Sequence, residues 1–182
     1  MSEEINASNL SNLSVGDSIY DIAHLLPTTL KLVTSSRPGG INIRVVFSNH
    51  CYTESFKPDE HAEELCIMDG SAKRAFSAER HDLSFSLPDM IKLLPEAKVY
   101  LTPEANFFQL HAITDDQRGE YRMFFRLKRS HLKGIDLLMF VESAYRPEPS
   151  TSRPIKDFQK VRFKVVVDKT LKGERVTFNT KR

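Results

Sequence analysis

The sequence predicts an α+β fold, a twisted antiparallel sheet of five or six strands with helices from the N-terminal half packed on one face. From residue 97 onward, short segments of β-forming residues follow one another, joined by short polar connections that often contain glycine. Parallel neighbours need crossovers of a dozen or more residues, so these links favour an antiparallel meander. At 182 residues the chain is expected to form a single domain, residues 18–182, behind a flexible polar tail at residues 1–17.

The first half of the chain supplies the expected helices and one clear strand. Residues 18–33 show no clean period and predict a short helix broken near Pro27, since proline removes a backbone donor. Residues 57–70 open on proline and aspartate and end in glycine, which predicts a short acidic helix. Residues 41–48 alternate apolar with mostly polar side chains and predict a half-buried strand.

The clearest helical signal lies at residues 86–97. Ser86 and Asp89 have the spacing of a capping box, and Pro95 ends the helix. The apolar residues on its inner face are Met90, Leu93 and Leu94.

Six strands are predicted after this helix. They are residues 98–102, 106–114, 120–129, 135–146, 159–169 and 174–178. The fourth is apolar on both sides, which is typical of a central strand.

Charge is unevenly distributed along the chain. Residues 1–91 carry 7 Lys and Arg against 13 Asp and Glu, whereas residues 92–182 carry 19 against 11. Strand alternation places Arg122, Phe124, Arg126 and Lys128 on one side of their segment, and Lys160, Arg162 and Lys164 on one side of another. Such a surface suits phosphates with an aromatic ring to stack on a base. A solvated outer face, or cations that protect sheet edges, would give the same pattern.

Nucleophilic and metal chemistry find little support. Cys51 adjoins His50 at the end of a strand, and neighbouring strand residues point to opposite faces. The possible zinc ligands His50, Cys51, His61 and Cys66 lack the paired spacing of structural zinc sites. The chain shows none of the G-x-x-x-x-G-K-[ST], G-x-G-x-x-G, H-E-x-x-H or G-x-S-x-G motifs. We therefore expect free thiols, no metal and no cofactor.

Metal-free acid–base chemistry on RNA remains open. His50 and His81 are the candidate proton-transfer groups, Tyr145 a supporting residue, and Arg80 a further phosphate ligand. The series YRMFFRLKRS, IDLLMFVESAYRPE and VRFKVVV resembles the closing strands of barnase-, RelE- and colicin-type ribonuclease toxins, with Ser143-Ala144-Tyr145 as their short strand-end element. That resemblance implies a metal-independent endoribonuclease.

The leading hypothesis is thus an RNA-acting protein whose basic sheet face holds phosphate. The alternative is a non-catalytic accessory protein that docks an acidic protein or nucleic-acid partner on that face. A secretion signal and an apolar membrane-crossing run are both missing from the sequence, which predicts a cytoplasmic protein with no membrane partner.

Overall fold

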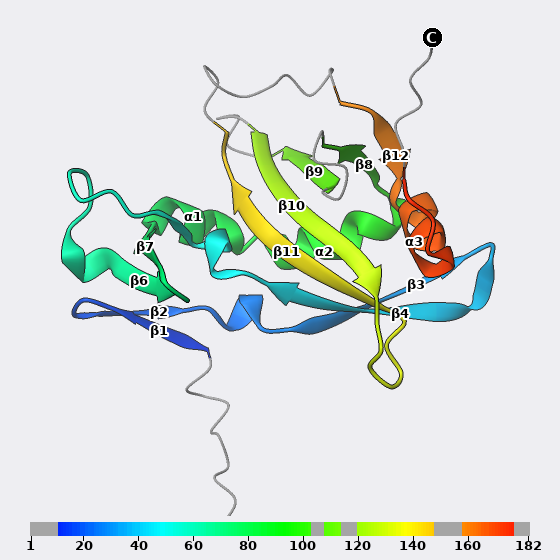
Figure 1. Ribbon diagram of the computed structural model, residues 1–182, viewed down its shortest axis with the longest axis horizontal. Helices are drawn as coiled ribbons and strands as arrows, with labels where there is room; N and C mark the ends of the chain where they lie inside the picture. The colour runs from blue at the N-terminus through cyan, green and yellow to red at the C-terminus, as the bar shows by residue number, and fades with distance from the viewer. Residues whose placement is uncertain (1–10, 103–107, 114–119, 148–157, 177–182) are drawn as a thin grey trace, which may run out of the picture.

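Strands dominate the computed structural model and are divided among three sheets (Figure 1). The structure describes residues 11–102, 108–113, 120–147 and 158–176, with the backbone alone at 108–113. The predicted α+β class is confirmed, but the single sheet of five or six strands is wrong. The largest sheet has seven strands in the order β12 (Lys160–Arg162), β8 (Lys98–Leu101), β9 (Phe108–Ile113), β10 (Glu120–Arg129), β11 (Leu137–Tyr145), β4 (Arg37–Phe47) and β3 (Thr28–Thr34).

The seven-stranded sheet is mixed rather than antiparallel. Strands β8, β9, β10 and β11 form the predicted meander, with antiparallel pairing at each step. Strand β11 then pairs in parallel with β4, and β4 turns back into an antiparallel pair with β3. The parallel pair joins segments far apart in sequence, so the short links that predicted the meander carry no information about it.

Strands replace both helices predicted early in the chain, and two small sheets contain most of these strands. Strands β1 (Asn12–Val15) and β2 (Ser18–Asp21) pair with each other, so the polar segment at 1–17 contains a strand, and residues 1–10 lie outside the described part. The three-stranded sheet consists of β5 (Thr53–Ser55), β7 (Ala72–Phe76) and β6 (Cys66–Asp69), with a 3₁₀ turn, η4 (Glu63–Leu65), before β6.

The segment predicted as a helix at 18–33 is β2, a 3₁₀ turn η2 (Ala23–Leu25) and β3. In β3, Leu30, Leu32 and Thr34 are buried while the residues between them are exposed. This period of two, begun just after Pro27, is the strand signal that the mixed composition of the segment obscured.

Helices α1 (Ala78–Ser84) and α2 (Leu87–Leu93) follow one another almost without a break, and η5 (Leu94–Glu96) ends the run. The predicted helix at 86–97 is confirmed, but its capping box is not. Ser86 has helical dihedral angles and donates its hydroxyl to the Leu83 carbonyl, so it makes no cap. The predicted inner face is also shifted, since Leu93 is exposed. The buried residues of this run are Leu87, Met90, Ile91 and Leu94.

The segment predicted as a strand at 159–169 is mostly helix. Strand β12 ends at Arg162, and α3 (Phe163–Lys172) begins at the next residue. Phe163, Val166 and Val167 are buried at helical spacing, and Gly173 ends the helix with a φ of 74° in the left-handed region. The consecutive valines fit either structure locally, and packing against the sheet selects the helix. Residues 177–178, predicted as part of a further strand, lie outside the described part.

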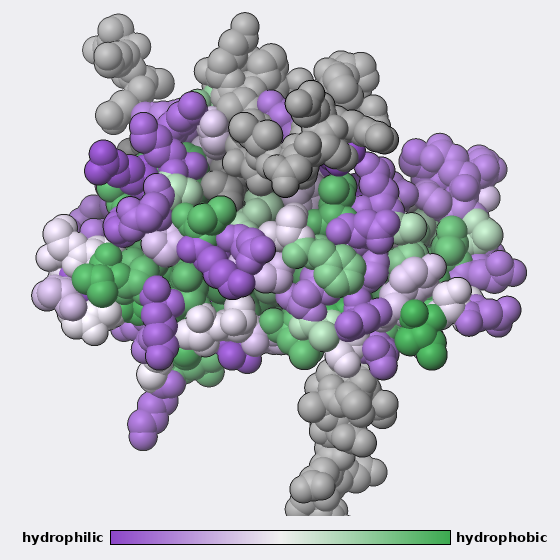
Figure 2. Space-filling model, turned by 180° about the vertical axis from the view of Figure 1, so that it is seen from behind, coloured by the Kyte–Doolittle hydropathy of each residue, from purple (hydrophilic) through white to green (hydrophobic). Residues whose placement is uncertain are grey.

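One face of the large sheet forms the core with the helices. Side chains of β3, β4, β10 and β11 pack in one cluster with those of α2 and α3. Figure 1 shows β10 and β11 in front of α1 and α2, so the viewer faces the side of the sheet that is turned away from these helices. From behind, hydrophilic and hydrophobic side chains are interspersed on the far surface (Figure 2). Within the described ranges, the helices are too short and too polar to cross a bilayer.

Candidate functional site

Two parallel strands end at the same edge of the sheet. Residues Leu137–Val141 of β11 pair with Ile43–Phe47 of β4, so both strands leave the sheet side by side. The amide of Ser48, the first residue after β4, donates to the Val141 carbonyl at 2.9 Å. The parallel pairing therefore brings the segment after β4 next to the last residues of β11.

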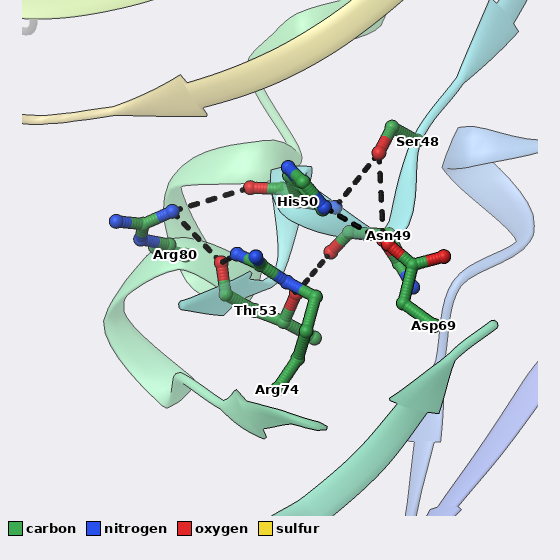
Figure 3. Close-up of polar contacts among 7 residues, drawn as sticks. All are labelled: Ser48, Asn49, His50, Thr53, Asp69, Arg74 and Arg80. Carbon is green, nitrogen blue, oxygen red and sulfur yellow. Dashed lines mark hydrogen bonds and ion pairs between the residues drawn. The ribbon is translucent and has the colours of Figure 1, made fainter. Parts of the chain in front are cut away.

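The turn after β4 holds His50 beside a carboxylate. This turn, η3 (Asn49–Cys51), is capped by Ser48, whose hydroxyl accepts from the His50 amide at 3.1 Å. The His50 ring points toward Asp69 at the end of β6, with 3.0 Å between Nε2 and Oδ2 (Figure 3). Both side chains are partly exposed, so the pair is open to solvent. The sequence pointed to His50, whereas Asp69 gave no signal because its contact is set by the tertiary fold.

Arg80 connects this turn to the end of β11. Its Nη1 donates to the Thr53 carbonyl at 2.8 Å and to the His50 carbonyl at 3.4 Å (Figure 3). Its guanidinium carbon lies 5.0 Å from the centre of the Tyr145 ring. Tyr145 in turn stacks on Phe124, with ring centres 5.3 Å apart and an angle of 15°. The structure therefore unites the predicted residues Arg80, Phe124 and Tyr145 in one stacked column, next to the His50 turn.

Arg74 was missed by sequence reasoning and reinforces the same turn. Its guanidinium donates to Thr53 twice, to the hydroxyl at 2.7 Å and to the carbonyl at 3.1 Å. Burial, with the nearby Arg80 charge as a second cause, lowers the pKa of Arg74. Thr53 thus holds two guanidinium groups close together, which raises the positive potential at this edge.

The side of the sheet turned away from α2 and α3, which we call the outer face, is lined by alternate residues of four strands. Cross-strand pairing aligns Lys128 with Leu138, Leu138 with Arg44, and Arg44 with Thr29. A second row aligns Arg126, Phe140 and Val46. The residues that define the outer face are Thr29, Lys31, Asn42, Arg44, Val46, Arg122, Phe124, Arg126, Lys128, Leu138, Phe140, Ser143 and Tyr145.

The outer face combines cations with an exposed aromatic ring. Lys128 is exposed, the Arg126 side chain is 51% exposed, and Phe140 is 41% exposed. Arg44 and Phe140 were not among the predicted site residues. Alternation had placed Arg44 on the polar side of its segment, whereas the segment of Phe140 was predicted to be apolar on both sides. Only the parallel register shows that these two residues lie beside Lys128 and Arg126.

The predicted phosphate ligands differ in their exposure to solvent and in their pairing with carboxylates. Arg122 is 5% exposed and bonded to Glu120 through Nε at 3.0 Å and through Nη2, so it is held within the protein. Arg126 forms an ion pair with Glu142, whose side chain is 14% exposed. Lys128 extends into solvent without such a carboxylate beside it in the described part of the chain.

Three other predicted residues lie elsewhere. His81 is 7% exposed, and its Nε2 lies 2.9 Å from the Asp21 carbonyl oxygen, amid the rings of Tyr20 and Phe76. Arg162 is exposed on β12, the opposite edge strand, three strand spacings or roughly 14 Å from β10.

Lys164 belongs to α3, where its ammonium pairs with Glu96 at 2.7 Å. The second basic strand face predicted from residues 160–164 is therefore wrong. Its cations are divided between an edge strand and a helix on the core side of the sheet.

The cysteines are free, as predicted. Cys51 is fully buried, and that burial raises the pKa of its thiol to about 12, which keeps it protonated and unreactive at neutral pH. His61 lies 3.4 Å from Glu54 and accepts from the Lys57 amide, apart from the other proposed zinc ligands. Across the described residues, no three His, Cys, Asp or Glu side chains are grouped as metal ligands would be.

The fold and the site define an α+β protein with a mixed sheet whose outer face is basic and partly aromatic. The model of the YjaZ family matches residues 12–171, and the chain belongs to that family. Neither a curated protein nor a solved structure matches it.

Proposed function

We propose that this protein binds single-stranded RNA on the outer face of its large sheet. The observation that carries the proposal is the juxtaposition of Arg126, Lys128 and Arg44 with the exposed ring of Phe140 on adjacent strands. Cations of this kind attract phosphates, and every base can stack on an aromatic ring. Strands that present an aromatic ring between basic side chains are a recurrent way of holding unpaired bases.

The positive character of this face is local rather than a property of the whole chain. The net charge is only +2. Within the described outer face, Glu142 is the carboxylate beside Arg126, and it leaves Lys128 and Arg44 uncompensated in their row. Phosphates would therefore be drawn to these strands.

Metal-independent cleavage of the bound RNA is the second part of the proposal, and the His50–Asp69 pair favours it. Cleavage needs a group that takes the 2′-hydroxyl proton, a group that protonates the departing 5′ oxygen, and cations for the charge that develops on phosphate. A histidine oriented by a carboxylate suits proton transfer. His50 would take the 2′-hydroxyl proton and then pass it to the departing 5′ oxygen. Arg80 would hold the phosphate, and the Tyr145 ring would support Arg80.

Binding is tested by fluorescence anisotropy with a labelled single-stranded RNA across a series of salt concentrations. Lys128→Gln should weaken binding and reduce the slope of log affinity against log salt by about 0.7, the loss of one phosphate contact. Lys172→Gln is the matched control, because it removes an exposed lysine from α3 on the other side of the sheet. Equal effects of the two variants would contradict binding on the outer face.

Cleavage is tested by incubating end-labelled RNA with the protein in EDTA and, separately, in magnesium. Discrete products that form in EDTA and are lost in His50→Ala and Arg126→Ala would support the nuclease. RNA that stays intact but is bound would leave a binding protein without turnover. No binding at all would favour the alternative, a docking face for an acidic protein.

A further inference from the structure

We propose that the outer face distinguishes RNA from DNA through Glu142, which accepts a hydrogen bond from a ribose 2′-hydroxyl after Arg126 has moved from Glu142 to the adjacent phosphate. This inference rests on the proposed RNA binding and names the part of the ligand that is recognised. It assigns to Glu142 a role in ligand recognition.

Glu142 occupies a β-bulge in the middle of the outer face. Opposite β10, Phe124 pairs with Ser143 and Phe125 pairs with Val141, so Glu142 is the extra residue of β11. A bulge interrupts the alternation of a strand and redirects a side chain. Here it places a carboxylate between the row of Arg126 and Phe140 and the stacked rings of Phe124 and Tyr145.

The carboxylate of Glu142 is only half satisfied. Oε1 pairs with Arg126, whereas Oε2 is buried and makes no hydrogen bond within the described residues. Buried polar atoms are nearly always paired in folded proteins, because an unpaired one loses its hydration without compensation. The buried oxygen Oε2 is therefore an acceptor without a donor in the described part of the chain, and a ligand can reach it only when Arg126 moves away from Glu142.

The Arg126 partner of Glu142 is open to solvent. Its side chain is 51% exposed, so a phosphate in solution can approach the guanidinium group. A phosphate offers Arg126 an equivalent charge-assisted contact. Departure of Arg126 alone would leave the 14%-exposed Glu142 as an unpaired buried charge, which is strongly unfavourable.

A ribonucleotide can replace Arg126 as the partner of Glu142, whereas a deoxyribonucleotide cannot. Each ribose carries its 2′-hydroxyl next to a backbone phosphate, so one nucleotide can supply the anion for Arg126 and the donor for Glu142. DNA brings the phosphate without the hydroxyl and leaves Glu142 unpaired. Discrimination of this kind, by leaving a polar group unsatisfied in the wrong complex, is far stronger than discrimination by shape alone.

The test compares three labelled oligomers of about 12 nucleotides: oligouridine, oligodeoxyuridine and 2′-O-methyl oligouridine. Uracil has no exocyclic amine, so donation from a base amine cannot imitate the ribose. The wild-type protein should bind oligouridine at least about tenfold more tightly than either of the others, since a hydrogen bond to a charged group is among the stronger ones. Gel analysis confirms that the oligomer is intact during the measurement.

Glu142→Met removes the acceptor while keeping a side chain of similar length. It should bring the preference for oligouridine close to one, and it should not weaken binding of oligodeoxyuridine, because Arg126 then no longer has to leave Glu142 to contact the phosphate. Lys128→Gln is the control that should weaken binding of all three oligomers together and keep the preference.

Equal wild-type affinity for oligouridine and its 2′-O-methyl form would overturn this inference while leaving RNA binding intact. A preference that persists in folded Glu142→Met would overturn it as well. If the wild-type protein binds none of the three oligomers, the proposed function itself fails. The wild-type comparison decides the matter even where the variant does not fold.

Discussion

Two successive hydrogen bonds determine which ring nitrogen of His24 carries the proton. The Ser84 hydroxyl donates its proton to the His81 carbonyl at 2.6 Å, so it can only accept from His24 Nε2, which lies 2.6 Å away. Nδ1 then carries the lone pair, and this atom is buried without a hydrogen-bond partner among the described residues. Burial, aided by the neighbouring His81 and opposed by Asp21, lowers the pKa of His24.

This lowered pKa makes the stability of the protein depend on pH below about 6.5, the usual value for histidine. In that range the unfolded chain takes up a proton at position 24 and the folded chain does not, so stability falls as pH falls toward the lowered pKa. His24→Gln should reduce the loss of unfolding free energy between about pH 7.5 and about pH 5.5, measured by urea denaturation. His131→Gln, which removes an exposed imidazole between β10 and β11, should keep the wild-type dependence. An unchanged loss in His24→Gln would contradict the assignment.

At the scale of elements, α3 is the segment in which local sequence and tertiary packing compete most closely. Alternation in a strand would bury Phe163, Val165 and Val167, whereas a helix buries Phe163, Val166 and Val167. The structure leaves Val165 40% exposed and Val166 fully buried. The Phe163 ring meets Phe125 of β10 edge to face, with ring centres 6.0 Å apart, which anchors the helix on the sheet.

Two adjacent substitutions distinguish these arrangements. Val166→Ala should lower the free energy of unfolding by about 2 kcal/mol, since it removes two buried methyl groups and leaves a cavity. Val165→Ala makes the same chemical change one residue earlier and should alter stability by no more than about 0.5 kcal/mol. Chemical denaturation of both variants measures the difference. The reverse order of costs would mean that this segment is a strand.

At the scale of the whole molecule, the sequence predicts what is local. The alternation of Ile41, Ile43 and Val45 predicted β4 correctly, and the short connections predicted the β8–β11 meander. The alternation of residues in β10 also predicted that the exposed side of this strand is basic. The pairing between β11 and β4 could not be predicted from the sequence, because strand alternation indicates which face a residue joins but not which strand lies beside it.

The residues of the candidate site also fall into those that the sequence could predict and those that it could not. His50, Arg80 and Tyr145 could be chosen by residue type, and the structure brings the last two together at 5.0 Å. The side taken by Ser143 and Tyr145 could not be assigned from alternation, because the bulge at Glu142 displaces every later side chain of the strand by one position. Asp69 reaches His50 only through the small sheet that replaced a predicted helix.

The parallel pair at the centre of the large sheet also governs when the fold can be completed. The Asn42 amide bonds to the Asp136 carboxylate, a partner 94 positions away, at the start of that pair. On the ribosome, β4 emerges together with β3 but must wait for β11. At synthesis rates of about 5–20 residues per second, that delay is roughly 5–20 s. Throughout it, the apolar strand β4 has one open edge, so this nascent chain is most vulnerable to aggregation before its second half has been made.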